Sequence, residues 1–124
     1  MANRYIGEVA APEFGDGFTI RLDMAGQGEL ESKFGAFEFA QKLGLGLAIM
    51  SSEFMIPFLE QSLRGPDGEL VRKVPDFSPL EPVARKCLDA FALFRYGKTH
   101  DEWVADNTQE AVKAKANPTT GTTA

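Results

Sequence analysis

The sequence has little of what catalytic and metal sites are made from. It holds one cysteine, Cys87, and one histidine, His100, among its 124 residues. A single cysteine cannot form a disulfide within the chain, and Cys87 stands among apolar neighbours, so we expect a small buried hydrophobic side chain. His100 is followed by Asp101 and Glu102, but consecutive helical residues do not face one metal ion together. We therefore expect His100 to be a surface residue in the first turn of a helix.

Motifs that bind nucleotides or calcium, or that mark a nucleophile, are also missing. The glycine pair in Gly44–Gly46 lacks the rest of a dinucleotide-binding or P-loop pattern. The Gly15–Gly17 segment lacks the acidic ligands at alternating positions that a calcium loop needs. No serine or cysteine stands in a motif that marks a nucleophile. The sequence therefore predicts a protein that is not an enzyme, with no catalytic residues, no cofactor and no metal.

Positive charge and long apolar runs are both scarce. Lysine and arginine number 13 against 18 aspartates and glutamates, which gives a net charge of −5. Without a cationic stripe we expect neither a nucleic-acid partner nor an anionic membrane surface. The longest apolar run, Leu43–Met50, is far shorter than the roughly 20 residues of a membrane span. The N-terminus has no apolar core after a basic start, so we expect no signal peptide and a cytoplasmic protein.

What is present is enough for one folded domain. Hydrophobic residues make up 44% of the chain and charged residues 25%, which is ordinary for a soluble protein of one-domain length. A domain of this size buries roughly two thirds of the surface of its unfolded chain. From residue 108 onward there is no aromatic residue, leucine or isoleucine. We therefore predict a globular domain over 1–107 and a weakly helical to disordered tail over 108–124.

Two runs near the N-terminus have the character of β-strands. Arg4–Ala10 carries several large apolar side chains, and Phe18–Leu22 alternates apolar and polar residues with a period of two. Between them, the sequence PEFGDG supplies proline, glycine and aspartate for a turn. Two strands alone are only marginally stable, so the predicted hairpin over 4–22 should pack on helices.

Helical patterns follow between residues 24 and 106. Asp23 can cap a helix that begins near residue 24, and the apolar side of this helix would include Leu30, Phe34 and Phe37. Because these three apolar residues recur at three- to four-residue spacing, we expect this side of the helix to face the core.

Two further helices are predicted in the apolar middle of the chain. One covers residues 36–43, after which Gly44 and Gly46 indicate a bend, and the next runs from residue 51 or 52 to residue 63. Pro57 either starts a later helix or kinks a longer one.

Capping boxes predict where the last two helices begin. One is Ser78–Glu81, with a proline at the first helical position, and the other is Thr99–Glu102. Gly97 should end the helix between them, and residues 69–77 should be mainly loop. The apolar stripe of that helix comprises Leu80, Val83, Cys87, Ala90, Phe91 and Phe94. The predicted fold is therefore α+β and mainly α: a hairpin packed on a bundle of four to five helices, with a mobile C-terminal tail.

Phenylalanine is abundant, with ten residues, six of which form pairs at helical spacing. The simplest interpretation is that these pairs form the core, and the alternative is that part of the set contacts a partner. Two observations favour the alternative: Leu43–Met50 is apolar on all sides, and Phe37 and Phe39 cannot point the same way on one helix. The candidate partner-binding residues are Phe37, Phe39, Leu45, Ile49, Met50, Phe54 and Met55.

The N-terminal third of the chain also carries a recognisable pattern. The opening ANRYIGEV is followed by the strand-like GFTIRLDM, with its Arg21–Leu22 step, and by a Leu-Glu-x-x-Phe-Gly stretch over Leu30–Gly35. This pattern, over roughly residues 3 to 37, resembles the small tail assembly chaperones of long-tailed phages and gene transfer agents. The resemblance implies a non-enzymatic cytoplasmic protein that binds the tape-measure protein, keeps it soluble and recruits tail-tube subunits. The candidate partner-binding residues named above would serve either client binding or self-association.

Two other classes of protein stay open on the sequence. One is a structural virion protein, a tail-tube or head–tail connector subunit, which would need more strand than the single hairpin predicted here. The other is a host-side adaptor that binds proteins unrelated to phage. The chain departs from the chaperone pattern in the apolar run Leu43–Met50 and in the long connection RGPDGELVRKVPDFSP.

Overall fold

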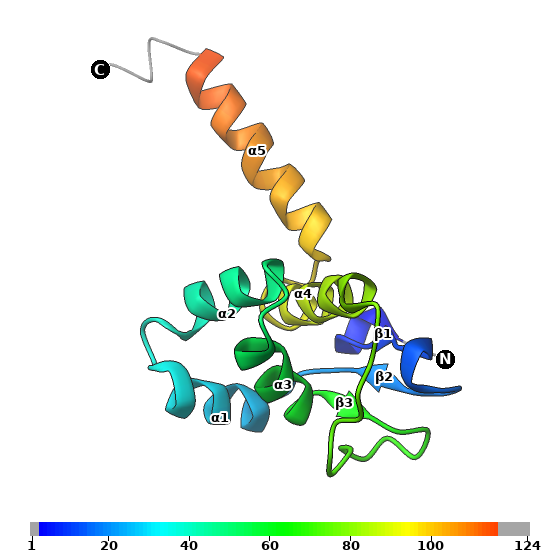
Figure 1. The fold of residues 1–124 in the computed structure, drawn as a ribbon. Coiled ribbons are helices and arrows are strands. Elements are labelled where there is room, and N and C mark those ends of the chain that lie inside the picture. Colours follow the sequence, from blue (N-terminus) through cyan, green and yellow to red (C-terminus); the bar gives the residue numbers. More distant parts are fainter. Residues whose placement is uncertain (1–2, 117–124) are drawn as a thin grey trace.

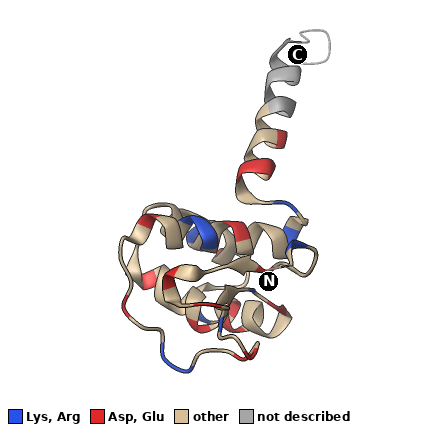
Figure 2. Cartoon of the chain, turned by 90° about the vertical axis from the view of Figure 1, so that its right-hand side faces the viewer, with Lys and Arg blue, Asp and Glu red and all other residues tan. Residues whose placement is uncertain are grey.

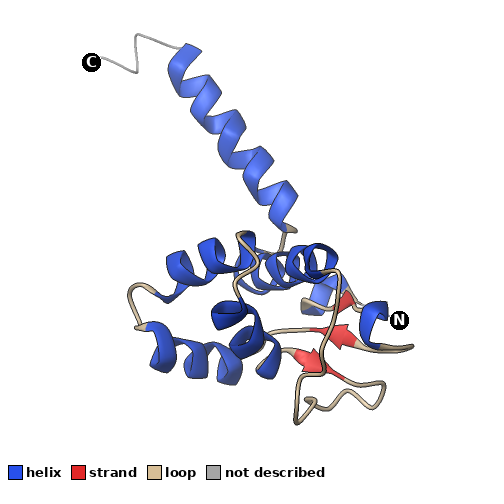
Figure 3. Ribbon diagram, viewed as in Figure 1, coloured by secondary structure: helices blue, strands red, loops and turns tan. Residues whose placement is uncertain are grey.

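One long helix, α4 (Leu80–Tyr96), contacts three of the other helices and two of the strands (Figure 1). A computed structural model of the chain describes residues 3–116, and side chains as far as Thr108. The elements in chain order are a 3₁₀ turn (Arg4–Ile6), β1 (Val9–Ala10), a second 3₁₀ turn (Pro12–Phe14), β2 (Thr19–Ile20), α1 (Met24–Phe34), α2 (Phe39–Ala48), α3 (Ser52–Glu60), β3 (Leu63–Arg64), α4 (Leu80–Tyr96) and α5 (His100–Ala116). Helices dominate and the strands form one small antiparallel sheet (Figure 3), so the predicted fold class is confirmed.

The sheet has three strands in the order β1-β2-β3, and each strand has two residues. The predicted hairpin is present, because Val9 pairs with Ile20 in antiparallel register. Its first strand is shorter than predicted, since the Asn3 side chain accepts a hydrogen bond from the Tyr5 N–H and holds Arg4–Ile6 in a 3₁₀ turn. The third strand was not predicted. Leu63 continues an apolar helical pattern in the sequence, but its backbone pairs with Ile20 of β2.

Helix α1 begins at the predicted cap. The Asp23 carboxylate accepts a hydrogen bond from the Gly26 N–H at 2.8 Å, which satisfies one of the free donors of the first turn. Its other oxygen lies 3.0 Å from a guanidinium nitrogen of Arg64, which connects α1 to β3. The helix ends at Phe34, so the expectation that Phe37 lies on its buried side is wrong. Phe37 stands in the following turn and is fully exposed.

The predicted bend at Gly44 and Gly46 is wrong, because helix α2 runs through both glycines without a break. A Cβ built on Gly46 would lie 2.2 Å from Cγ of Phe54, so this glycine allows α3 to pack against α2. A Cβ on Gly44 meets nothing within 4 Å. The glycines have opposite surroundings, and only Gly46 is required by packing.

Helix α3 covers Ser52–Glu60 and contains Pro57 in its interior, as the second of the two predicted alternatives had it. It ends three residues before the predicted residue 63, because the chain turns at Gln61 to form β3. The axes of α2 and α3 are bent by 113° relative to each other. Met55 and Phe58 of α3 therefore point into the core between α2 and α4.

The predicted capping box at the start of α4 is wrong. The N-cap residue is Pro79, which has no side-chain oxygen to offer, and no side chain caps this helix. Pro82 falls in the first turn, where its missing N–H would have had no partner within the helix. The predicted end is confirmed, since Gly97 adopts a left-handed conformation and its N–H donates to the Leu93 carbonyl.

The capping box of α5 is confirmed. The Thr99 N–H donates to a carboxylate oxygen of Glu102 at 2.9 Å, and the Glu102 N–H donates to the Thr99 hydroxyl at 3.3 Å. The helix extends to Ala116, so the first half of the predicted tail, residues 108–116, is helical. The second half of that prediction, residues 117–124, lies outside the described part of the chain.

The core lies between α4, α2, α3 and the sheet. Cys87 is fully buried, as predicted, and burial raises the pKa of its thiol. The largest side chains that are fully buried include Ile20, Leu22, Leu30, Leu43, Leu47, Phe58, Leu59 and Leu63. Of the six phenylalanines paired at helical spacing, five lie in the core or pack against it, and only Phe37 is exposed.

Candidate interaction surface

Chemistry-bearing side chains do not gather in the described part of the structure. Over these residues, no group of three or more histidine, cysteine, aspartate or glutamate side chains could hold a metal ion. His100 lies at the start of α5, as predicted, but it is half-buried, and its ring stacks on Trp103 with 6.4 Å between the ring centroids.

Helix α2 presents apolar side chains to solvent as well as to the core. Leu43 and Leu47 are completely buried, and Gly46 lies on the same inward side. Leu45 and Ile49, one turn apart on the opposite side, are each 64% exposed. The run that is apolar on all sides in the sequence thus divides into a core-facing half and a solvent-facing half. We call Leu45, Ala48, Ile49 and Met50 the outer face of α2; all four are exposed.

The structure separates the seven predicted partner-binding residues into two groups. Phe37, Leu45, Ile49 and Met50 are exposed, as a contact with another chain requires. Phe39 and Met55 are buried and Phe54 is half-buried, so their assignment to a docking surface is wrong.

Phe39 is 5% exposed and belongs to the core. Its ring meets that of Phe91 edge-on, with 6.2 Å between centroids, and the Arg95 guanidinium lies 5.5 Å from the ring centre. Because an aromatic ring and a cation of α4 both contact Phe39, its side chain is not available to a partner. The sequence could not show this, because helix α2 begins at Phe39 and its phase is set by α4.

Phe54 and Met55 face inward for the same kind of reason. Phe54 fills the space above Gly46 and stacks on Phe34, with ring centroids 4.9 Å apart. Met55 is 1% exposed and lies in the core cluster. The sharp turn between α2 and α3 directs both side chains back toward α1, α2 and α4.

The end of α2 has an unusual backbone. Met50 adopts a left-handed conformation with φ of 59°, the only described residue other than glycine with positive φ. The Ser51 N–H donates to the Gly46 carbonyl at 2.9 Å and the Met50 N–H donates to the Leu47 carbonyl at 3.1 Å. This is the Schellman arrangement that ends many helices, and glycine usually holds the position occupied here by Met50.

A groove opens beside the outer face of α2, with a volume of about 470 Å³. Three segments that are far apart in the sequence line it: the end of α2, the first half of α4 and the first turn of α5. Its apolar lining comprises Leu47, Ala48, Met50, Pro82, Ala84 and Leu88. Sequence reasoning missed this groove because no local pattern indicates that residues 48, 82 and 101 lie together.

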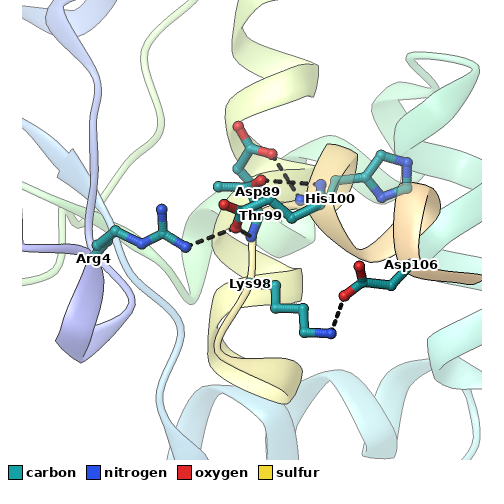
Figure 4. A network of polar contacts seen from close by, with 7 residues as sticks. Arg4, Asp89, Lys98, Thr99, His100 and Asp106 are labelled. Atoms are coloured by element: carbon teal, nitrogen blue, oxygen red, sulfur yellow. Dashed lines mark hydrogen bonds and ion pairs between the residues drawn. The ribbon is translucent and has the colours of Figure 1, made fainter.

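Hydrogen bonds fix the first turn of α5, which forms one end of the groove (Figure 4). The Asp89 carboxylate of α4 accepts a hydrogen bond from the His100 N–H at 3.0 Å. Burial raises the pKa of Asp89, against the effect of that hydrogen bond. The Arg4 guanidinium lies 2.7 Å from Glu102, and this hydrogen bond lowers the pKa of Glu102 to about 2.

Along the described chain, lysine and arginine positions are scattered among those of aspartate and glutamate (Figure 2). No single helix among the described residues is long and apolar enough to cross a membrane, although the bent pair α2 and α3 passes the same length and composition test. In comparisons with known proteins, no family model, curated protein or solved structure matches this chain.

Proposed function

We propose that the protein is a non-enzymatic phage tail assembly chaperone that binds the tape-measure protein and recruits tail-tube subunits in the host cytoplasm. The observation that carries this proposal is the outer face of α2, where Leu45 and Ile49 are each 64% exposed on consecutive turns. The resemblance of residues 3 to 37 to such chaperones supports the choice of client.

Apolar side chains exposed on consecutive turns of a helix indicate a binding surface more strongly than single exposed apolar side chains do. Isolated apolar residues are common on protein surfaces and need no explanation. On α2, however, two large aliphatic side chains adjoin Ala48 and Met50, which also line the groove. Burying such surface is worth roughly 25 cal/mol per Å² of area removed from water. A contiguous apolar face beside a groove is typical of a site that binds another chain.

The other properties of the molecule suit a chaperone for a helical client. Amphipathic helices dock by laying their apolar side into an apolar groove, and methionine adapts its flexible side chain to different partners. The net charge of −5 favours solubility of a complex and disfavours binding to DNA.

The alternative function, a structural tail-tube or head–tail connector subunit, has less support. A tube ring built from β-structure needs long strands that pair between subunits. The strands described here have two residues each. A host-side adaptor has no specific observation in its favour and is an outcome of the experiment below.

The test is co-expression with the tape-measure and tail-tube proteins encoded by the same genome. We expect the tape-measure protein to be soluble only when this protein is present, and to co-purify with it. Recovery of the protein from purified particles in amounts similar to the tube subunit would favour the structural alternative. Failure to bind either tail protein would favour an adaptor.

A further inference from the structure

The outer face of α2 and the groove form one continuous apolar surface. Ala48 and Met50 belong to both, since they are exposed on the outer side and line the groove. From them the surface extends to Leu45 and Ile49 on one side and to the α4 lining of the groove on the other. A small molecule held in the groove would leave Leu45 and Ile49 uncovered. An elongated partner can cover both parts.

The rim of the groove carries more negative than positive charge. Three carboxylates line it, from Glu81, Asp89 and Asp101. Of the two cations there, Lys86 forms an ion pair with Glu13, which leaves Arg85 to balance the three. Asp101 also disfavours the ionised form of Asp89, in the same direction as the burial of Asp89. A partner that brings lysine or arginine to this rim would relieve this repulsion.

Met50 places a flexible side chain at the junction of the groove and the outer face, at a cost to the backbone. A left-handed conformation is unfavourable for a residue with a Cβ, and glycine would end α2 without that strain. Backbone strain of this kind is often found at functional positions. Here the strained residue is also one of the two whose side chains join the two parts of the surface, and the larger of them.

We propose that the groove and the outer face of α2 together form a docking site for one amphipathic helix with lysine or arginine beside its apolar stripe. This proposal rests on the proposed function, because it states the chemistry of the client segment that the chaperone binds. The apolar stripe of the helix lies over Leu45, Ile49 and Met50. Its cations lie near Glu81, Asp89 and Asp101.

The probes are two labelled synthetic peptides of about 18 residues, long enough for five helical turns. Both have the same leucine stripe, and the polar positions are all lysine in one and all glutamate in the other. Fluorescence anisotropy with the full chain should show binding of the lysine peptide, and at least about tenfold weaker binding of the glutamate peptide. Equal binding of both peptides would overturn the charge component of the proposal.

Substitutions locate the site on the surface. Met50→Gly should weaken binding of the lysine peptide about tenfold while the melting temperature stays the same or rises, because glycine suits the backbone at this position. Leu45→Ser with Ile49→Ser should weaken binding similarly. The matched control, Met24→Ser with Ile56→Ser, removes two exposed apolar side chains from other helices and should bind as wild type.

A charge-matched pair separates local from overall attraction. Glu81→Gln with Asp101→Asn should weaken binding of the lysine peptide several-fold. Glu29→Gln with Asp76→Asn makes the same change in net charge at exposed positions that do not line the groove, and should leave affinity unchanged. Equal losses in the two pairs would show that the peptide senses only net charge, which would overturn the proposal.

Self-association is the remaining outcome to distinguish. If the wild-type chain forms a dimer by analytical ultracentrifugation, and Leu45→Ser with Ile49→Ser abolishes it while the peptide competes with it, the occupant is a second copy and the proposal fails. The peptide results decide the docking site, and co-purification of the tape-measure protein decides the function. The two can therefore fail separately.

Discussion

At the scale of single residues, Phe37 and Phe39 show that two side chains only two positions apart can have opposite exposure to solvent. Phe37 stands in a turn with its ring in solvent, whereas Phe39 is enclosed by Phe91 and Arg95 of α4. Both are the same residue type in the same apolar segment. Their difference comes from where α2 begins.

We therefore expect Phe39→Ala to lower the free energy of unfolding by about 3–5 kcal/mol, because it removes a buried ring and leaves a cavity. Phe37→Ala is the matched control and should change it by about 0.5 kcal/mol or less, as for most surface positions. Urea denaturation followed by circular dichroism measures both. Similar effects of the two substitutions would contradict the described phase of α2.

The two glycines of α2 provide a second matched pair. Gly46→Ala would place a methyl group 2.2 Å from the ring of Phe54, so we expect a loss of about 1–3 kcal/mol from overpacking. Gly44→Ala meets no atom within 4 Å and should stabilise the helix by about 0.5–1 kcal/mol. Thermal melts of the two variants should therefore shift in opposite directions. A gain in stability from Gly46→Ala would show that α3 does not pack on α2 as described.

At the scale of elements, α5 is the helix whose attachment depends most on side chains at one end. Its beginning contacts α4, and the rest of the helix projects away from the other helices and the sheet (Figures 1 and 2). Asp89, Arg4 and the capping box hold its first turn. Most helices in proteins owe their stability to a packed apolar side. The hydrogen bonds at the base of α5 therefore contribute much of the stabilisation that holds its first turn against the groove.

We expect Asp89, at the base of α5, to make the free energy of unfolding sensitive to pH. Its pKa is raised in the folded state by burial and by Asp101, with His100 and Arg85 acting in the opposite direction. Ionisation of Asp89 is therefore less favourable in the folded protein than in the unfolded chain, where its pKa is about 3.9. The stability associated with protonated Asp89 is fully present below that value and is lost as the pH rises through the folded pKa.

Asp89→Asn keeps a side-chain oxygen that can accept the hydrogen bond from the His100 N–H, but it carries no charge. We expect the free energy of unfolding of this variant, relative to wild type, to increase as the pH rises from about 4 toward neutrality. Urea denaturation of both proteins across this range measures the difference. A difference that is constant, or that decreases with pH, would contradict the described surroundings of Asp89.

The elements also show what could be predicted from sequence. Most signals that act within one turn of chain are confirmed: the Asp23 cap, the Thr99–Glu102 box and the stop at Gly97 are present. The Ser78–Glu81 box is the exception, because Pro79 stands at the N-cap of α4. Features that depend on distant contacts could not be predicted: the bend predicted at Gly46 is wrong, because the side chain that requires this glycine, Phe54, becomes adjacent only when α3 folds back.

The third strand was missed for a similar reason. Leu63 follows an apolar helical pattern, and only its pairing with Ile20, more than forty positions earlier, makes it a strand. A single sequence contains no local signal for such a pairing, because strand geometry here is imposed by β2.

At the scale of the whole molecule, the excess of apolar residues in the middle of the chain was a sound indication of an exposed surface. Leu45, Ile49 and Met50 are exposed, as that reasoning expected, while Phe39 and Met55 complete the core. Composition alone could suggest that some residues face outward. It could not select them, because that choice requires the phase of α2 and the angle between α2 and α3.

The groove could not be predicted from the sequence at all. Its lining comes from α2, α4 and α5, which approach one another only through the packing of α2 and α5 on α4. The sequence thus indicated an exposed apolar surface, and the structure adds the groove beside it and the acidic rim. That another chain binds there is our proposal.

The most direct test of the central claim is co-purification of the tape-measure protein with surface variants of this chain. We predict that wild type and the control Met24→Ser with Ile56→Ser recover equal amounts of soluble tape-measure protein, whereas Leu45→Ser with Ile49→Ser recovers little and keeps its own melting temperature. Undiminished recovery with the α2 variant would contradict the claim that this face of the molecule binds another chain.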